Sequence, residues 1–455
     1  MKHTAYILLL GGLLGGLVGC NKYLEVQPDN TLTVPKTLTD LQALLNNSQK
    51  MNLQRTPNFS EASGDDYFLS DDQFNSLDVE LQRIYTWKVK EYKFQNDWSI
   101  AYEPVFIANL CLEQLQKIPP TTNQAVWNQV KGAALFFRSY YFQQLVNTFA
   151  PAYDAATATN DLGIVLRTHS DFNEPSERAS VQQTLEQVLH DAKEAAYLLP
   201  DLPKLPTMPS KAAAYGLLAR TYLSMRYYDS AYHYADAALH LKSDLMNFAA
   251  DNDINSSITS QIPFRQFNKE TIFYSEMATT NYVINPSTIA VDSNIIKSYN
   301  KDDLRLTAFY TKEDTIYRFK GSYTGNEWQY FTGIAVDELY LIRSECAARV
   351  GIIGQAISDM QTLLKSRWNE SANPPVITPA DSKEAVTMIL NERRKELFMR
   401  GTRWMDIKRL NKEGRNISLQ RVVAGTTYRL NANDPYFALP LPQDIVSNTV
   451  PQNKY

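Results

Sequence analysis

The feature that most restricts the fold of this 455-residue chain is a set of paired amphipathic helix patterns. In two runs between residues 98 and 149, apolar and aromatic residues recur at spacings of three and four, which is the period of a helix with one buried face. Pro151 ends the second run, because proline cannot continue a helix. Ser180 and Ser210 precede two further runs and are typical N-cap residues. These runs predict helices through Leu199 and to about Met225. The residues of the first two runs are Trp98, Tyr102, Val105, Phe106, Asn109 and Leu112, then Val130, Ala133, Ala134, Phe137, Tyr140, Tyr141 and Leu145.

Part of this pattern fits the tetratricopeptide repeat, a helical hairpin of 34 residues with fixed small and large positions. The matching residues are Tyr215, Leu218, Ala219, Tyr222, Ala231 and Ala238, while position 235 is an alanine with Tyr234 beside it. A weaker match runs from Leu339 to Leu364, and the segments 98–117 and 122–149 fit a third hairpin. The sequence therefore predicts a mostly α fold of tetratricopeptide-like helical hairpins, over about 98–241 and 336–410.

A different kind of sequence, 243–335, separates the two groups of repeats. It is polar and aromatic, with short β-like runs such as 271–274, and we interpret it as an irregular insertion of loops and short strands. Insertions into helical repeats gather on one face, which is often the binding face. Elsewhere we expect a short helix at Leu38–Leu45, loops at 56–75 and 152–177, and a helix from Lys383 to about Met399 followed by irregular chain.

The N-terminus predicts export. Lys2 and His3 precede an uncharged apolar run, Ala5 to Val18, that is too short to span a bilayer and has the layout of a signal peptide, residues 1–19. Leu17-Val18-Gly19-Cys20 resembles the bacterial lipobox, in which the cysteine is acylated and begins the mature chain, here 20–455. The alternative is an ordinary signal peptide that contains a cysteine. Two or more acyl chains hold a protein stably on a membrane.

Composition and motifs argue against several functions. The net charge of −4, with both signs mixed, lacks the basic stripe that nucleic-acid binding needs. Cys111 and Cys346 lie in apolar helical patterns, so buried free thiols are favoured over a disulfide. The histidines are scattered, and no metal-ligand spacing, GxSxG, HExxH or P-loop motif occurs. A carboxylate pair stays open, but we predict no enzyme, no metal and no cofactor.

Several stretches together resemble the SusD/RagB family of outer-membrane nutrient-binding lipoproteins. They are Tyr23-Leu24-Glu25-Val26 with Pro28, residues 336–351, residues 391–397 with 401–409, and the end of the chain, 439–445 with Asn448, Gln452 and Asn453. The chain departs from the family pattern at Met399-Arg400 and at its last residues. The resemblance implies one SusD-like body over 20–455 on the cell-surface side of the outer membrane. It also implies a SusC-like TonB-dependent β-barrel transporter as the partner, with this chain as its lid.

The most specific of these motifs, 392–409, has a structural interpretation. Glu396 and Arg400 are spaced for a helical ion pair, Gly401 can end a helix in a left-handed turn, and Trp404 would pack. Asp406 would pair with the neighbouring arginines. We interpret this cluster of charges as a structural ion-pair network rather than a catalytic site.

The chain has 27 tyrosines, 6 tryptophans and 19 phenylalanines, and flat rings with polar neighbours suit sugar binding. A ring covers the C–H face of a sugar, while Asp, Asn or Arg can hydrogen-bond its hydroxyls. Two loop regions supply both kinds of residue, and the resemblance implies that such loops form the ligand surface. Trp328 is the strongest single candidate, because Gly325 and Asn326 place it beside a turn. The candidates are Asp65, Asp66, Tyr67, Trp87, Asn281, Tyr282, Tyr323 and Trp328.

The leading hypothesis is thus a cell-surface lipoprotein that captures oligosaccharide and delivers it to the transporter. A second hypothesis keeps the architecture but makes the cargo a peptide, which predicts a groove with free backbone donors and acceptors. A third is a repeat scaffold without a small-molecule ligand, which predicts no pocket at the 243–335 surface.

Overall fold

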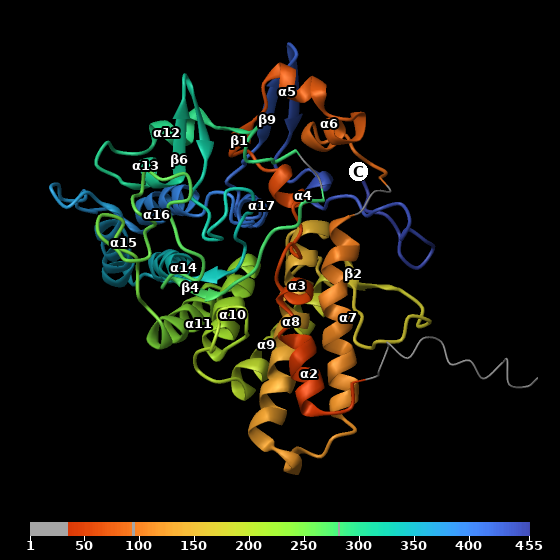
Figure 1. Cartoon of the computed structure of the whole chain (residues 1–455). Helices are drawn as coiled ribbons and strands as arrows, with labels where there is room; N and C mark the ends of the chain where they lie inside the picture. Colours follow the sequence, from red (N-terminus) through yellow and green to blue (C-terminus); the bar gives the residue numbers. More distant parts are fainter. Residues whose placement is uncertain (1–34, 93–95, 281–282) are drawn as a thin grey trace, which may run out of the picture. The chain divides into compact units, whose positions relative to one another are not determined.

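The structure is a computed structural model that describes residues 35–92, 96–280 and 283–455. The chain divides into a unit of residues 1–37 and a body of residues 38–455, and Figure 1 labels the elements of the body. The predicted signal peptide, the lipobox and Cys20 lie outside the described residues, as do Asn281 and Tyr282.

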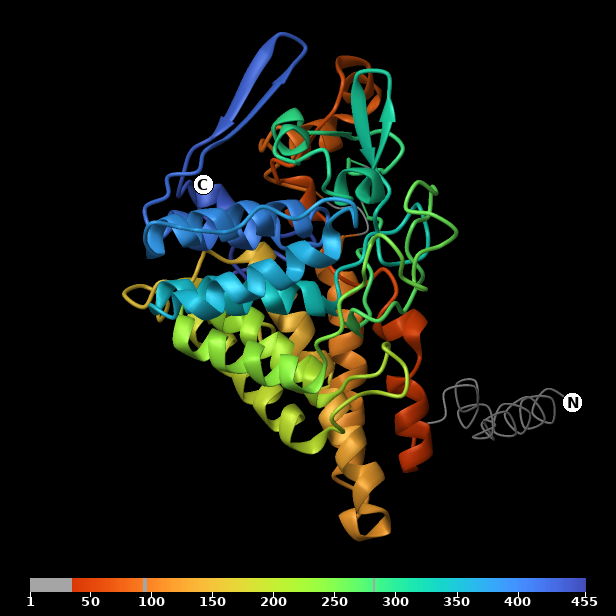
Figure 2. The ribbon, with the colours of Figure 1, turned by 90° about the vertical axis from the view of Figure 1, so that its left-hand side faces the viewer.

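The body is built on a stack of antiparallel helices, which confirms the mostly α fold. Each helix packs on the next in chain order from α7 to α11, and α14 then packs on α11, α15 and α16. Figure 2 shows the α10–α11 hairpin, the α14–α15 hairpin and the C-terminal helices in successive layers. The helices are α7 (Asp97–Leu115), α8 (Gln124–Phe149), α9 (Val181–Leu198), α10 (Lys211–Met225), α11 (Tyr228–Leu241), α14 (Val336–Arg349), α15 (Ile353–Arg367), α16 (Ser382–Glu396) and α17 (Arg403–Asn411).

The local signals for these helices are confirmed. Ser180 caps α9 in a capping box, in which its Oγ accepts from Gln183 N and Gln183 Oε1 accepts from Ser180 N. Ser210 Oγ accepts from the backbone N–H of Ala213 and caps α10. In the hairpin, the small residues Ala231, Ala235 and Ala238 are fully buried, while the rings of Tyr222 and Tyr234 stack at 5.6 Å.

Residues 242–335 contribute short elements rather than long helices. They lie between α11 and α14, yet these two helices contact each other, so the helical stack continues past the insertion. The sheets of the body are all two-stranded and antiparallel in the described residues. The strand pairs are β1 (Tyr67–Phe68) with β5 (Ala290–Val291), β2 (Leu162–Val165) with β3 (Arg178–Ser180), β4 (Thr271–Phe273) with β8 (Ile334–Ala335), β6 (Tyr310–Glu313) with β7 (Ile316–Phe319), and β9 (Leu419–Val423) with β10 (Thr426–Leu430).

The remaining helices are short. The predicted helix at Leu38–Leu45 is confirmed as α2. The others are α3 (Ser48–Met51), α4 (Phe59–Ala62), α5 (Asp71–Ser76), α6 (Val79–Tyr85), α12 (Ser293–Lys297), α13 (Arg305–Phe309) and the 3-10 turns η2 (Pro120–Thr122) and η3 (Pro435–Phe437).

Three predicted irregular segments differ from the expectation. The 56–75 segment contains α4, β1 and part of α5, and 152–177 contains β2. The stretch from Phe59 to Ser63 is buried, and Asp97 accepts from two backbone N–H groups at its start, those of Asn58 and Phe59. The chain after Met399 forms α17 and the β9–β10 hairpin. Ala424 and Gly425 turn that hairpin with φ of 48° and 70°, a conformation for which Ala-Gly is a weak sequence signal.

Cys111 and Cys346 are both free and buried, so the prediction of buried thiols is confirmed. Burial raises the pKa of the Cys111 thiol to about 12. Both thiols therefore serve as small core side chains rather than as nucleophiles.

Candidate functional site

Trp328, the strongest sequence candidate, lies on the surface of the insertion. Its side chain is large and apolar, yet the residue is 53% exposed. Asn326 Oδ1 accepts from the Trp328 backbone N–H at 2.7 Å, and Gly325 has a φ of +67°, so the predicted turn is present. The turn therefore holds a flat ring toward solvent.

A second exposed ring, Phe267, stands on the neighbouring loop. A Cβ on Gly325 would lie 2.9 Å from the backbone nitrogen of Gln266, so the two loops are in close contact. Phe267 is 39% exposed and has a φ of +59°, a region that bulky residues seldom occupy. Backbone strain of this kind is often retained at binding sites. Phe267 is an aromatic residue in a polar loop, so the reasoning applied to Trp328 could have indicated it from the sequence as well.

Polar side chains connect these loops to a cavity. Gln266 Nε2 donates to the Tyr274 hydroxyl, which donates to Glu276 Oε1 at 2.6 Å. Burial raises the pKa of Glu276. Glu276 lines a cavity of about 310 Å³ together with Gln49, Leu53, Gln54, Arg55, Ile100, Thr279 and Thr280.

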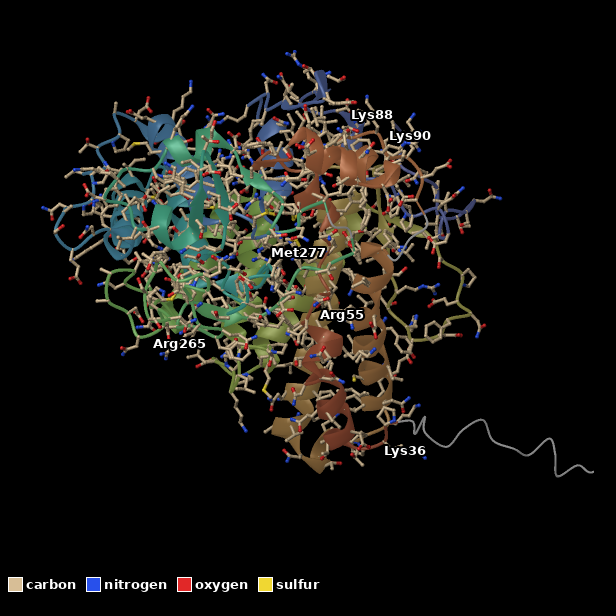
Figure 3. All side chains as sticks on the ribbon, turned by 45° about the horizontal axis from the view of Figure 1, so that its top comes forward. Lys36, Arg55, Lys88, Lys90, Arg265 and Met277 are labelled. Atoms are coloured by element: carbon tan, nitrogen blue, oxygen red, sulfur yellow. The ribbon has the colours of Figure 1, made fainter. Side chains whose placement is uncertain are left out.

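The N-terminal segment supplies the other wall of this cavity. Thr56 forms a parallel bridge with Met277, and Figure 3 labels Met277 and the nearby Arg55 on this part of the body. Thr279 Oγ1 donates to Gln54 Oε1 at 3.1 Å. On the insertion side, Met277 N donates to Tyr330 O, so the chain that carries Trp328 runs beside this segment.

We call this region the insertion surface. It is defined by Gln54, Arg55, Gln266, Phe267, Glu276, Thr279, Thr280 and Trp328. The predicted residues Asn281 and Tyr282 follow Thr280 directly but lie outside the described residues. The surface combines aromatic faces with hydrogen-bonding groups of both kinds, which is what recognition of a neutral polyhydroxylated ligand requires.

Two of the predicted aromatic residues, Tyr67 and Trp87, lie elsewhere and are buried. Together with Tyr85 they surround the guanidinium of Arg421, at 5.0, 4.7 and 3.9 Å from the ring centres. Their polar tips donate to the backbone oxygens of Ala62 and Ser63. The cation that these rings contact therefore belongs to the same chain.

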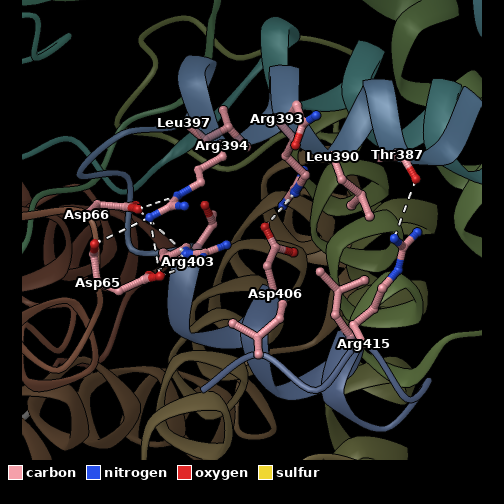
Figure 4. A pocket seen from close by; sticks show the side chains of 14 residues that line it. Asp65, Asp66, Thr387, Leu390, Arg393, Arg394, Leu397, Arg403, Asp406 and Arg415 are labelled. Carbon is pink, nitrogen blue, oxygen red and sulfur yellow. Dashed lines mark hydrogen bonds and ion pairs between the residues drawn. The ribbon is translucent and has the colours of Figure 1, made fainter. Parts of the chain in front are cut away.

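Asp65 and Asp66 lie beside the 392–409 motif and face arginines rather than solvent (Figure 4). Arg403 Nε donates to Asp65 Oδ1, and Arg394 Nε donates to Asp66 Oδ1, both at 2.7 Å. Burial acts to raise the pKa of Asp65, but the two arginines outweigh it and hold that pKa below its usual range. These residues line a separate cavity of about 360 Å³.

Tyr323 is 1% exposed and belongs to the interior of the body. Its hydroxyl donates to Glu270 Oε2 at 3.0 Å, and its ring lies 4.9 Å from the guanidinium of Arg400. Of the predicted residues that the structure describes, only Trp328 thus lies on the insertion surface.

The predicted ion-pair network of the 392–409 motif is present, with one different pairing. Trp404 is buried, and Asp406 accepts from Arg393 and Arg409 as expected. Glu396 and Arg400 do not pair, however. Because α16 ends at Glu396, the helical spacing is lost, and Arg400 binds Asp337 instead at 2.9 Å. Gly401 has the predicted left-handed conformation, with a φ of +74°.

Comparison with known proteins agrees with this architecture. A family described as "Starch-binding associating with outer membrane" matches residues 22–223, and one described as "SusD family" matches residues 320–448. The chain belongs to the SusD/RagB family. No curated protein sequence matches the chain.

Solved structures share the fold over nearly the whole length. A protein from Bacteroides vulgatus described as sugar binding is 19% identical, with a TM-score of 0.74, over 92% of this chain and 99% of its own. A SusD superfamily protein from Bacteroides thetaiotaomicron is 18% identical, with a TM-score of 0.73, over 92% and 100%. A SusD-like carbohydrate binding protein from Bacteroides fragilis is 15% identical, with a TM-score of 0.64, over 90% and 98%.

No helix among the described residues is both long and apolar enough to cross a membrane.

Proposed function

We propose that this chain is a glycan-binding lipoprotein that binds oligosaccharide at the insertion surface. The observation that carries the proposal is the exposed ring of Trp328, held by a turn that contacts the loop of Phe267. Hydrogen bonds from that loop through Tyr274 to Glu276 connect it to a polar cavity. The family description as starch-binding and the sugar-binding descriptions of two structural relatives support the ligand class.

The chemistry of the surface suits a sugar in two respects. The rings of Trp328 and Phe267 offer apolar faces to the C–H side of a pyranose. Glu276, Thr279 and Arg55 offer acceptors and donors to its hydroxyls. Asn281 and Tyr282, which follow Thr280 in the sequence, are included in this proposal as ligand-binding residues. Binding needs no catalytic group and no cofactor.

The lipid anchor and the transporter complete the proposal. Acylation of Cys20 would keep the chain at the outer membrane, on the cell-surface side, without a transmembrane helix. Delivery to a SusC-like TonB-dependent transporter, with this chain as a hinged lid, follows from the family resemblance. Copurification tests this part of the proposal. We expect the transporter to copurify with the acylated chain, and this copurification to be lost in cells that carry Cys20→Ser.

The surface favours a sugar over a peptide or an inert scaffold. A peptide that adds to an edge needs free backbone groups, but here Met277 N donates to Tyr330 O and Ala278 N donates to Thr56 O. The scaffold hypothesis predicts no pocket at the 243–335 surface, whereas Glu276, Thr279 and Thr280 line a cavity.

The direct test is a binding screen of the soluble chain that starts after Cys20, against polysaccharides and peptide pools. We expect a polysaccharide to bind, and Trp328→Ala to weaken that binding at least about tenfold, or about 1.4 kcal/mol. Tyr197→Ala is the matched control, because Tyr197 is an exposed ring, 86% accessible, on α9. Absence of polysaccharide binding by the unaltered chain, or equal binding by Trp328→Ala, would refute the proposal.

A further inference from the structure

A second cavity lies against a different face of α7. The rings of Trp98, Tyr102 and Phe106 recur every four residues along this helix and form a stripe that a loop, residues 166–176, and the C-terminal residues 444–450 cover only in part. The space left between them is about 530 Å³. This volume lies within the range of about 300–1,000 Å³ that is usual for small-molecule sites.

Aromatic rings form the walls of this cavity. Trp98 and Tyr102 lie 5.0 Å apart with their planes tilted by 40°, and Trp98 is buried at the base. Phe172, on the covering loop, stacks on Phe106 at 4.6 Å. Phe172 is nevertheless 79% exposed, so it holds a large apolar face at the edge of the cavity.

Hydrogen bonds occupy backbone oxygens of the covering loop and of Val165, the last residue of β2 before it. The Tyr102 hydroxyl donates to Val165 O at 2.6 Å. Asn109 Nδ2 donates to Arg167 O and His169 O at 2.7 and 3.2 Å. The carbonyl groups of residues 165, 167 and 169 are thus already paired, which does not favour an extended peptide at this edge.

Polar side chains line the rim. Asp444 and Thr449 come from the C-terminal segment, and Arg167 comes from the covering loop. The Asp444 carboxylate and the Thr449 hydroxyl provide acceptors and a donor beside the aromatic walls, while the Arg167 guanidinium donates to Glu174 O and Ser176 Oγ of its own loop. A lipid chain would need a more uniformly apolar lining, whereas a sugar ring uses both kinds of surface.

We propose that this cavity is a second carbohydrate-binding site, separate from the insertion surface. The inference rests on the proposed function for its ligand class. The two sites lie on different sides of α7, because Ile100 lines the first cavity, whereas Trp98 and Tyr102, each about 200° away around the helix, line the second. One polysaccharide that reached both sites would be held by two linked contacts, which raises avidity above that of either site.

The test counts binding equivalents of short probes. The soluble chain is titrated by calorimetry with trisaccharides from starch, xylan, β-glucan and pectin, each too short to bridge the two sites. For the trisaccharide that binds, we expect two equivalents for the unaltered chain and one for the double variant Phe172→Ala, Asp444→Ala. We expect one equivalent for Trp328→Ala and two for the control Tyr197→Ala. Both altered residues of the double variant are exposed, and an unchanged thermal midpoint verifies its fold.

The outcomes separate this inference from the proposed function. If the unaltered chain bound one equivalent, and Trp328→Ala lost it while the double variant kept it, the second site alone would be overturned. One equivalent that only the double variant removes would support the second site and overturn the insertion surface. No trisaccharide binding would overturn both. The chain could instead bind phenylalanine-containing tripeptides and no sugar. If the double variant abolished that peptide binding, the ligand class proposed for the second site would be overturned.

Discussion

At the scale of the residue, Arg421 shows how one buried cation can organise aromatic side chains from distant parts of the sequence. Its guanidinium donates to the backbone oxygens of Tyr85, Ala62 and Gly64 and contacts three rings. Strand β9 is thereby fixed to the N-terminal segment. A planar guanidinium suits this position because it donates in several directions while its faces meet the rings.

Arg421→Lys should therefore lower the free energy of unfolding by about 1–3 kcal/mol, because one ammonium cannot reach all three carbonyl groups. Chemical denaturation measures the effect. Arg429→Lys on β10 is the control, since Arg429 is exposed and should change stability by less than about 0.5 kcal/mol. Equal stability of the two variants would contradict the role given to Arg421.

Glu61 predicts a pH dependence of stability. It is 2% exposed and accepts from Gly401 N at 3.0 Å. Burial, with a contribution from Asp66, raises the pKa of Glu61 from 4.5 to about 8. Between these values the folded chain keeps a proton that the unfolded chain releases, so the free energy of unfolding falls as pH rises. Over this pH range the free energy of unfolding falls by at most about 5 kcal/mol.

Glu61→Gln should remove this dependence, because glutamine does not ionise and can still accept from Gly401. The measurement is the free energy of unfolding from pH 4.5 to 8 for both proteins. We expect the difference between them to grow in favour of the variant as pH rises. Parallel curves would show that Glu61 does not titrate in this window.

At the scale of the element, helix packing depends on where small residues lie. Gly216 on α10 faces the insertion, and a Cβ there would lie 2.5 Å from Cγ2 of Ile334 on β8. Gly354 on α15 has open space, with nothing within 4 Å. Gly216 lies in the middle of α10 and Gly354 in the first turn of α15, so the same substitution tests packing at one site and helix propensity at the other.

Gly216→Ala should destabilise the fold by about 1–3 kcal/mol, because isoleucine is branched at Cβ and cannot easily move aside. Gly354→Ala should instead stabilise it by up to about 1 kcal/mol, since alanine favours the helix and meets no neighbour. Thermal denaturation of the two variants checks both signs. Stabilisation by both changes would contradict the close contact between α10 and β8.

At the scale of the whole molecule, buried ion pairs connect the insertion to the helical stack. Arg367 on α15 donates to Glu396 on α16 and to Glu270 in the insertion, at 2.8 and 2.9 Å. Glu396 also accepts from Arg305 of the insertion at 2.9 Å. Glu270, Glu396 and Asp337 lie close enough together to hold a cation, and Arg367 and Arg400 supply the positive charge there.

Arg367→Met should consequently lower the free energy of unfolding by about 3–5 kcal/mol, because it leaves the buried carboxylate of Glu270 without its cation and Glu396 with Arg305 alone. Lys365→Met, at an exposed position two residues away on the same helix, is the control and should have little effect. Chemical denaturation measures the effect, and we expect a single transition in the unaltered chain because the insertion and the helices unfold together. Separate transitions in the unaltered chain would contradict this coupling.

Much of the fold could be predicted because its signals are local. Ser180 and Ser210 cap helices through backbone groups three residues away, and Leu38–Leu45 contains its own apolar face. Trp328 could be predicted for the same reason, since Gly325 and Asn326 form the turn that exposes it. The sequence motif at 392–409 likewise indicated charge pairing correctly, although not every partner.

The placement of the other candidate residues depended on partners far along the chain. The sequence around Tyr67 and Trp87 predicted exposed loop aromatics. Both rings instead contact Arg421, which also donates to the backbone oxygen of Tyr85, 336 residues away in the sequence. Asp65 is bound by Arg403 from 338 residues away. By itself the sequence determined the helical hairpins and the family, because turns, caps and helical periods act over a few residues. Only the tertiary structure decided which rings and charges are free to meet a ligand, because burial and ion pairing depend on segments that meet through packing.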